Sequence, residues 1–204
     1  MTPTPYADPG FPLRPDEAPG ARREERRWLP LLCVLAVIAV IVLGGYITAG
    51  ALSEPAGPPV SVPGVVSVRP LSGWEFAGRD TVTDARFFRL TRGNGNLDVL
   101  AFTALVGAPT ALAQRYVDQV LGAELKQLSV SNHLQAVHLA SGRPGVRFSY
   151  VGVTSDSSES IEGEVTVVMT SSGGVVFDGW APEGLLQYAL GDVHTMIDRA
   201  VVAA

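Results

Sequence analysis

The chain contains 204 residues, which is enough for one ordinary domain with accessory segments. Hydrophobic residues make up 47% of it and charged residues only 17%, below the roughly 25% that is typical of soluble domains. The formal net charge is −5, and the excess of acidic residues falls entirely after residue 52. An acidic domain disfavours nucleic acid as a partner, because surfaces that bind nucleic acid are basic.

The first segment, residues 1–27, is polar and rich in proline, with almost no aliphatic residues. Such a segment cannot bury a hydrophobic core, so we expect a disordered tail that mainly sets membrane topology. Thr2, Thr4 and Tyr6 leave a second role open, in phosphorylation or docking.

An uncharged run follows, because no charged residue occurs between Arg27 and Glu54. Its centre, residues 31–43, is almost entirely aliphatic. A helix needs about 20 apolar residues to cross the hydrocarbon core of a bilayer. The sequence therefore predicts a single transmembrane helix over residues 28–52. Its sole cysteine is Cys33, so the rest of the chain has no disulfide or thiol chemistry.

The charges beside this run predict its orientation. Four basic residues precede it directly, whereas the first basic residue after it is Arg69; the four are Arg22, Arg23, Arg26 and Arg27. Arginine and lysine near the end of a span stay in the cytoplasm. We therefore expect a cell-membrane protein with a cytoplasmic N-terminus and an extracytoplasmic C-terminal domain. Signal-peptide cleavage after Ala51 stays open, although the long leader and the long apolar run favour an uncleaved anchor.

Residues 53–69 are predicted to form an extended spacer, because this stretch is rich in proline and glycine. Residues 70–204 are predicted to form one α+β domain. Strands are expected at 74–76, 86–91 and 97–105, with a glycine- and asparagine-rich hairpin turn at 93–96. Further strands are expected at 145–153, 161–170 and 174–180.

Two amphipathic helices complete the predicted domain. The first begins near Pro109 and carries one apolar stripe at helical spacing, formed by Leu112, Tyr116, Val117, Val120 and Leu121. The second is predicted to begin near Pro182 and to continue to the end of the chain. Each helix must bury its stripe, so we expect an antiparallel sheet flanked by the two helices.

This order of elements resembles the PsbP-like α/β/α sandwich, including the LpqN-type cell-envelope proteins of mycobacteria and their relatives. The resemblance covers about residues 70–204. It rests on Gly73-Trp74, the Gly-Asn hairpin, Tyr116-Val117, Gly163-Glu164-Val165, and the strand Val175-Val176-Phe177 that leads into Ala181-Pro182. The resemblance implies a non-enzymatic accessory or binding protein, and it supplies no shared catalytic residues. LpqN-type proteins are usually lipid-anchored, whereas this chain is predicted to have a helical anchor.

No catalytic, cofactor or metal site is predicted. His133 and His138 provide only two ligands, fewer than a zinc site needs, and we expect both to be solvated. His194 is spaced to pair with Asp198 on a helix, but no Gly-x-Ser-x-Gly nucleophile motif is present. Glu162 and Glu164 share one strand face, which we interpret as a solvent-facing strand. Trp74 and Trp180 are interpreted as core or sheet-end residues.

The best indication of a partner-binding surface is a group of arginines on an otherwise acidic domain: Arg79, Arg86, Arg89 and Arg92. Clustered guanidinium groups on or beside a hairpin are suited to anionic lipid headgroups or to an acidic protein partner. A solvated strand face explains the same pattern.

Two functional hypotheses follow. The first is a non-enzymatic, membrane-anchored binding or adaptor module that scaffolds or regulates a protein complex in a bacterial cell envelope. The second is a carrier or sensor whose sheet and helices enclose an apolar ligand, such as a lipid. A well-formed cavity between sheet and helix would favour the second hypothesis over the first.

Overall fold

The computed structural model describes residues 57–82, 85–103 and 107–203. The predicted tail and transmembrane helix, residues 1–27 and 28–52, lie outside these ranges. Among the described residues, no helix has the length and apolar character needed to cross a membrane.

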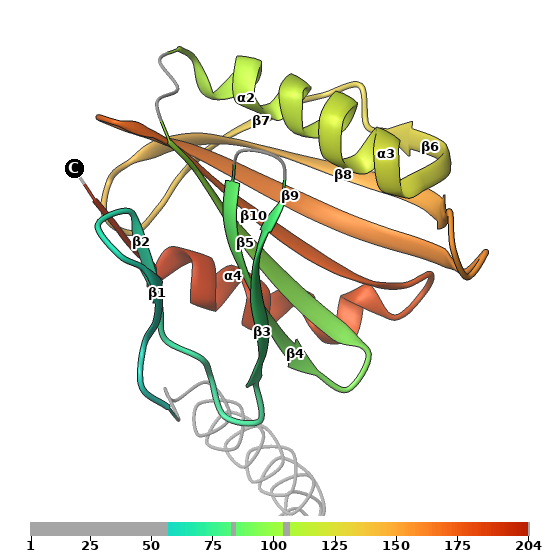
Figure 1. Cartoon of the computed structure of the whole chain (residues 1–204), viewed down its shortest axis with the longest axis horizontal. Helices are drawn as coiled ribbons and strands as arrows, with labels where there is room; N and C mark the ends of the chain where they lie inside the picture. Colours follow the sequence, from blue (N-terminus) through green and yellow to red (C-terminus); the bar gives the residue numbers. More distant parts are fainter. Residues whose placement is uncertain (1–56, 83–84, 104–106, 204) are drawn as a thin grey trace, which may run out of the picture. The chain divides into compact units, whose positions relative to one another are not determined.

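The described chain is built on an eight-stranded sheet in which all neighbouring strands run antiparallel (Figure 1). Strand β7 (Gln135–His138) pairs with β8 beside β6. From one edge to the other, the remaining strands have the spatial order β3 (Glu75–Val82), β4 (Ala85–Arg92), β5 (Gly95–Thr103), β10 (Gly173–Pro182), β9 (Ser160–Thr170), β8 (Pro144–Thr154) and β6 (Leu125–Val130).

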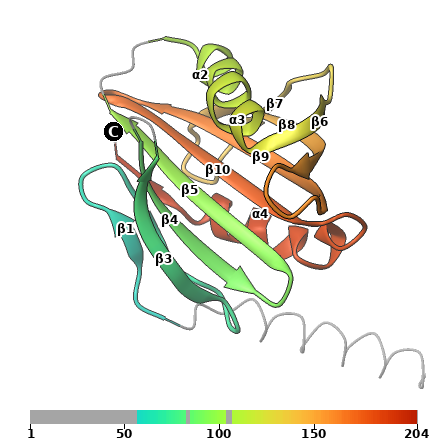
Figure 2. The same ribbon diagram turned by 45° about the vertical axis from the view of Figure 1, so that its right-hand side comes forward.

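Helices cover both faces of this sheet (Figures 1 and 2). One face carries a continuous helical segment made of α2 (Pro109–Tyr116), η1 (Val117–Leu121) and α3 (Gly122–Glu124). The opposite face carries α4 (Leu190–Asp198), which follows the short 3-10 turn η2 (Leu186–Tyr188). The predicted antiparallel sheet between two helices is confirmed.

The second helix begins later than predicted. Pro182 does not start it but ends β10, where it pairs with Ile161 of β9. Gly184 then adopts a left-handed conformation with φ of 82°, and α4 begins only at Leu190. The helix also ends earlier than predicted, at Asp198, and Val201 lies in the short strand β11 (Val201–Val202). Strands β6 and β7 have no counterpart among the predicted elements.

A second, three-stranded sheet extends the folded domain toward the N-terminus. Its order is β1 (Val60–Val62), β2 (Val66–Val68) and β11 among the described residues. Val62, Val66 and Val68 are buried and join the core that lies beneath α4. Residues 60–68 therefore belong to the folded domain, which corrects the prediction of an extended spacer over 53–69.

The alternating side chains of the central strands form two separate cores, one on each face of the sheet. On the α4 face, Phe88, Leu90, Val99 and Phe177 are fully buried with residues of the helix, among them Val193, Met196 and Ile197. On the α2 face, Leu100, Val165, Val167 and Val176 pack with Leu112, Tyr116 and Val120. Strands β5 and β10 are covered on both faces, which explains why their sequences are almost continuously apolar.

We predict that Gly179→Ala lowers the free energy of unfolding by about 1–3 kcal/mol, because an added methyl group would lie 2.7 Å from Val193 Cγ1 and push α4 away from the sheet. Urea denaturation of the full-length protein measures the effect. Gly191→Ala within α4 is the control, because its added Cβ meets nothing within 4 Å. Alanine should leave stability unchanged or raise it by up to about 1 kcal/mol there. Equal loss of stability in both variants would contradict the packing argument.

Candidate functional site

A cavity of about 480 Å³ lies between the helical segment and the sheet on the α2 face. This volume falls within the range of about 300–1,000 Å³ that is typical of small-molecule sites. Its apolar walls come from β4, β5, η1, β6 and β9: Phe87, Leu100, Val120, Leu121, Leu125 and Ile161. Its polar lining consists of Arg89, Asp98, Tyr116, Glu124, Tyr150, Thr154, Ser155, Asp156, Asp178 and Trp180.

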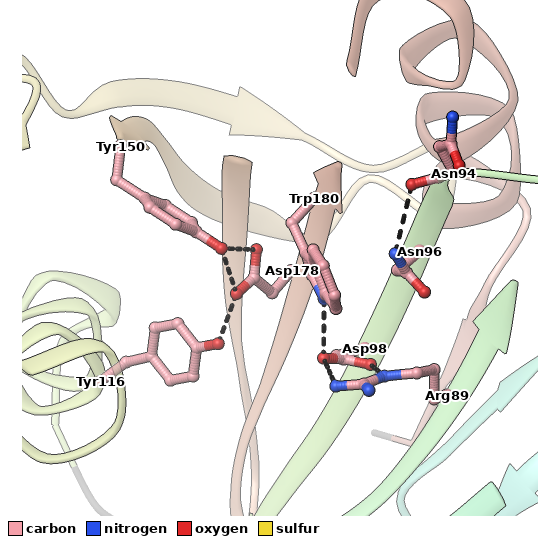
Figure 3. A network of polar contacts seen from close by, with 8 residues as sticks. All are labelled: Arg89, Asn94, Asn96, Asp98, Tyr116, Tyr150, Asp178 and Trp180. Carbon is pink, nitrogen blue, oxygen red and sulfur yellow. Dashed lines mark hydrogen bonds and ion pairs between the residues drawn. The ribbon is translucent and has the colours of Figure 1, made fainter. Parts of the chain in front are cut away.

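The carboxyl group of Asp178 lies at the buried end of this cavity, with 2% of the residue exposed. The hydroxyl group of Tyr116 donates a hydrogen bond of 2.6 Å to Asp178 Oδ2 (Figure 3). The hydroxyl of Tyr150 lies 3.1 Å from both carboxyl oxygens of Asp178. Asp178 belongs to β10, Tyr116 to α2 and Tyr150 to β8, so three elements meet at one carboxyl group.

The register of the sheet explains how these groups meet. Asp178 on β10 pairs with Val165 of β9, and β9 in turn brings Gly163 opposite Tyr150 of β8. A side chain at position 163 would collide with the ring of Tyr150, so glycine is needed for this ring to lie across β9 toward Asp178. Tyr116 reaches the same point from the last turn of α2.

Burial of these three groups changes their acidity. Desolvation raises the pKa of Asp178 to about 7, although the hydroxyl groups of Tyr116 and Tyr150 oppose the change by stabilising the ionised form. Desolvation and the neighbouring Asp178 carboxylate also raise the pKa of both tyrosines well above the usual value. The hydroxyl groups therefore remain protonated donors, while Asp178 changes charge near neutral pH.

A second buried carboxyl group, that of Asp98, lies beside Asp178 on the neighbouring strand β5. Arg89 of β4 holds it with two hydrogen bonds, Nε to Oδ1 over 2.6 Å and Nη2 to Oδ2 over 2.8 Å. Trp180 donates its indole N–H to Asp98 Oδ2 over 3.0 Å (Figure 3). The Arg89 guanidinium also lies 5.1 Å from the Trp180 ring. Asp98 is thus a paired carboxylate, and its hydrogen bond raises the pKa of Arg89.

Exposed residues form the open side of the cavity. Glu124 ends α3, and Ser155 and Asp156 lie in the β8–β9 turn. The amide of Ser155 donates to the carbonyl oxygen of Glu124 over 2.9 Å, which joins the two segments. Partial desolvation raises the pKa of Glu124, and the nearby carboxylates of Asp98 and Asp156 act in the same direction while Arg89 opposes them.

Comparison with solved structures agrees with this arrangement of sheet and helices. Cyanobacterial PsbP (CyanoP) from Synechocystis sp. PCC 6803 aligns with a TM-score of 0.53 and 14% sequence identity, over 71% of this chain and 91% of that chain. The fold is PsbP-like. The Saccharomyces cerevisiae Ran-binding protein Mog1p aligns with a TM-score of 0.47 and 11% identity, over 73% of this chain and 96% of its own.

LpqN of Mycobacterium tuberculosis, a protein involved in cell envelope biogenesis, aligns with a TM-score of 0.45 and 12% identity, over 72% of this chain and 90% of its own. At 14% identity the likeness to CyanoP is one of fold. No family model and no curated protein sequence matches the chain.

In this PsbP-like domain the four arginines of the predicted partner-binding group do not share one face of the sheet. Arg89 lies on the α2 face and lines the cavity. Arg79, Arg86 and Arg92 lie on the α4 face. Arg79 donates to the carbonyl oxygen of Ser61 over 3.1 Å, and Arg92 forms an ion pair with Asp192 at the start of α4. Arg86 is exposed. Partner binding by these residues stays a prediction.

Of the histidines and glutamates that the sequence singled out, only His194 and Glu164 come together. His133 and His138 are exposed, in a loop and on β7. His194 pairs with Glu164 rather than with Asp198, and Arg147 also contacts Glu164, with Nε 3.3 Å from Oε1. Glu162 accepts a hydrogen bond from the amide of Leu186 over 2.9 Å. Within the described ranges, no three histidine, cysteine or acidic side chains converge in a way that would hold a metal ion.

The cavity residues were largely missed by reasoning from the sequence. Tyr116 is predicted only as part of an apolar stripe, and Trp180 only as a core or sheet-end residue, whereas both line the cavity. One signal was available: Asp178 is a carboxylate within the otherwise apolar run 175–181. A charged residue in such a strand is buried and needs polar partners. Their identity depends on the register, which the sequence does not state.

We predict that Asp178 makes the protein less stable as pH rises from acidic to neutral. Its folded-state pKa of about 7 lies above the ordinary 3.8, so between these values the folded protein binds more protons than the unfolded chain. The stability of wild type relative to Asp178→Asn should therefore fall as pH rises through this window, and level off above it. The change should be on the order of 4 kcal/mol at most, because one pKa unit corresponds to about 1.4 kcal/mol. Urea titrations at several pH values measure it, and a difference that does not vary with pH would contradict the prediction.

We also predict that Tyr116→Phe raises the pKa of Asp178 further, because the lost hydroxyl stabilises the ionised carboxylate. Carbon-13 NMR titration of the aspartate carboxyl groups measures the shift. Tyr188→Phe is the matched control, because Tyr188 is 79% exposed and does not line the cavity. An unchanged or lower Asp178 pKa in Tyr116→Phe would show that the hydrogen bond is not maintained in solution.

Proposed function

We propose that this protein is a non-enzymatic binding module of a bacterial cell envelope, anchored by a transmembrane helix over residues 28–52, and that the cavity on the α2 face is its ligand site. The observation that carries the proposal is the cavity itself, which has apolar walls and a polar end built from buried, hydrogen-bonded groups. Small-molecule sites combine these two features, because apolar walls supply affinity and a few fixed polar groups supply orientation. The anchor and the envelope location rest on the sequence.

The cavity gives the carrier or sensor hypothesis priority over a module that only docks proteins. The polar groups at its buried end are held rigidly by one another, as in the pairs Asp178–Tyr116 and Asp98–Arg89. Rigid groups of this kind suit recognition, since little conformational entropy is lost when a ligand binds. An adaptor role remains compatible, because a sensor must pass its ligand state to a protein partner. Arg86, exposed on the α4 face, is available for that contact.

The arrangement also supports a binding role without catalysis. Among the described residues that line the cavity, no serine, cysteine or lysine is paired with a general base in the way that activates a nucleophile. The only side-chain partners of the Asp178 carboxyl group among the described residues are the two tyrosines, which stabilise it where it lies.

We predict that Ser155→Trp abolishes ligand binding, because an indole at this exposed lining position would occupy the open side of the cavity. Its backbone amide contact to Glu124 does not involve the side chain, so the fold should be retained. The full-length protein is isolated from native membranes, and native mass spectrometry measures any small molecule that remains bound.

Ser172→Trp is the matched control, because Ser172 is exposed in the β9–β10 turn at the other end of the β10 strand. A bound molecule is expected in wild type and in this control but not in Ser155→Trp. Equal retention in all three proteins, or no bound molecule in any of them, would overturn the proposal.

A further inference from the structure

The charges that line the cavity are unequal in number. Four acidic residues line it, Asp98, Glu124, Asp156 and Asp178, together with one basic residue, Arg89. The two hydrogen bonds from Arg89 commit its charge to Asp98. Glu124, Asp156 and Asp178 form no ion pair with a basic residue of the cavity lining, although the charge of Arg89 acts on Glu124 and Asp178 at longer range.

These carboxyl groups are close enough to influence one another. Asp98 and Asp156 both disfavour ionisation of Glu124, while Asp98 and Glu124 both disfavour ionisation of Asp178. The interaction extends from the open side of the cavity, where Glu124 lies, to its buried end at Asp178. One positive charge placed between them would lie in the field of all these carboxyl groups.

The only lysine of the sequence, Lys126, does not neutralise this field from within the cavity. Lys126 lies on β6, two residues after Glu124, and its ammonium group donates to the carbonyl oxygen of Ser155 over 3.0 Å. It is exposed and is absent from the cavity lining. Apart from Arg89, the cavity lining therefore supplies no cationic side chain.

We propose that the cavity binds an organic cation, a protonated amine attached to an apolar body, and this inference rests on the proposed function. The ammonium group lies between Glu124 and the Asp178–Tyr150 pair, where carboxylate and hydroxyl oxygens accept its hydrogen bonds. The apolar body lies against Leu100, Leu121 and Ile161. The same charges disfavour fatty acids and phosphate-bearing lipids, because an anionic headgroup would meet four acidic residues and only one basic residue, Arg89, whose guanidinium group is already hydrogen-bonded to Asp98.

A series of three probes with one apolar body tests the inference: 4-phenylbutylamine, 4-phenylbutanol and 4-phenylbutyrate. Isothermal titration calorimetry uses the full-length protein in lipid nanodiscs, with empty nanodiscs as the blank. At pH 8 the amine is protonated and Asp178 is mostly ionised. We expect the amine to bind at least about tenfold more tightly than the alcohol, and the carboxylate to bind most weakly.

Variants then assign the charge effect to the cavity. Glu124→Gln should weaken binding of 4-phenylbutylamine about tenfold while changing that of 4-phenylbutanol less than about twofold. Glu124 is exposed, so this substitution should not affect folding. The matched control is Glu183→Gln, an exposed glutamate that does not line the cavity, and it should leave all three affinities unchanged.

The outcomes separate this inference from the proposed function. If the alcohol or the carboxylate binds as tightly as the amine, or if Glu124→Gln and Glu183→Gln behave alike, the organic-cation inference is wrong and the cavity remains a ligand site. If none of the three probes binds to wild type, and Ser155→Trp also releases no native ligand, both the inference and the proposed function are overturned.

Discussion

Asp178 lies on β10, where β5 and β9 flank it in the sheet and α2 covers the face toward which its carboxyl group points. A buried carboxyl group without partners is highly unfavourable, and in proteins it either finds hydrogen bonds or becomes protonated. Here both occur, since two tyrosine hydroxyls contact it and its pKa is raised to about 7. Tyr116 belongs to α2 and Tyr150 to β8. Because the buried carboxyl group on β10 needs hydrogen bonds from both, it fixes α2, β8 and β10 relative to one another.

The cavity follows from the same requirement. Hydroxyl and carboxyl groups occupy the centre of the α2 face, where aliphatic side chains would otherwise fill the space between η1 and the sheet. Gly163 contributes by leaving room for the Tyr150 ring to lie across β9. The Arg89–Asp98 pair and Trp180 extend the polar region along β5 and β4. Hydrogen-bonded partners hold these groups in place beside the cavity.

The two faces of the sheet use charge in different ways. On the α4 face, polar contacts fasten the helix to the sheet: Trp74 donates to Asp192 over 2.9 Å, Arg92 pairs with the same carboxylate, and His194 pairs with Glu164. Asp192 and Glu164 thus each have a basic partner. On the α2 face, Glu124, Asp156 and Asp178 form no ion pair with a basic residue of the cavity lining. This contrast supports a structural role for the α4 face and a binding role for the α2 face.

The sequence by itself determined the strands from 86 to 103 and from 145 to 180, the helix at Pro109, and the sandwich of one sheet between two helices, because these depend on local periodicity and turn residues. It did not determine β1, β2 and β11, whose three-residue and two-residue strands gain stability only by pairing with one another. It also placed the second helix too early, because the ladder with β9 extends β10 as far as Pro182. Only the tertiary structure placed Arg89 on the opposite face of the sheet from the other three arginines. It also brought together Asp98, Tyr116, Tyr150 and Asp178. Strand register decides these contacts, and Tyr116 and Asp178 are 62 residues apart in the sequence.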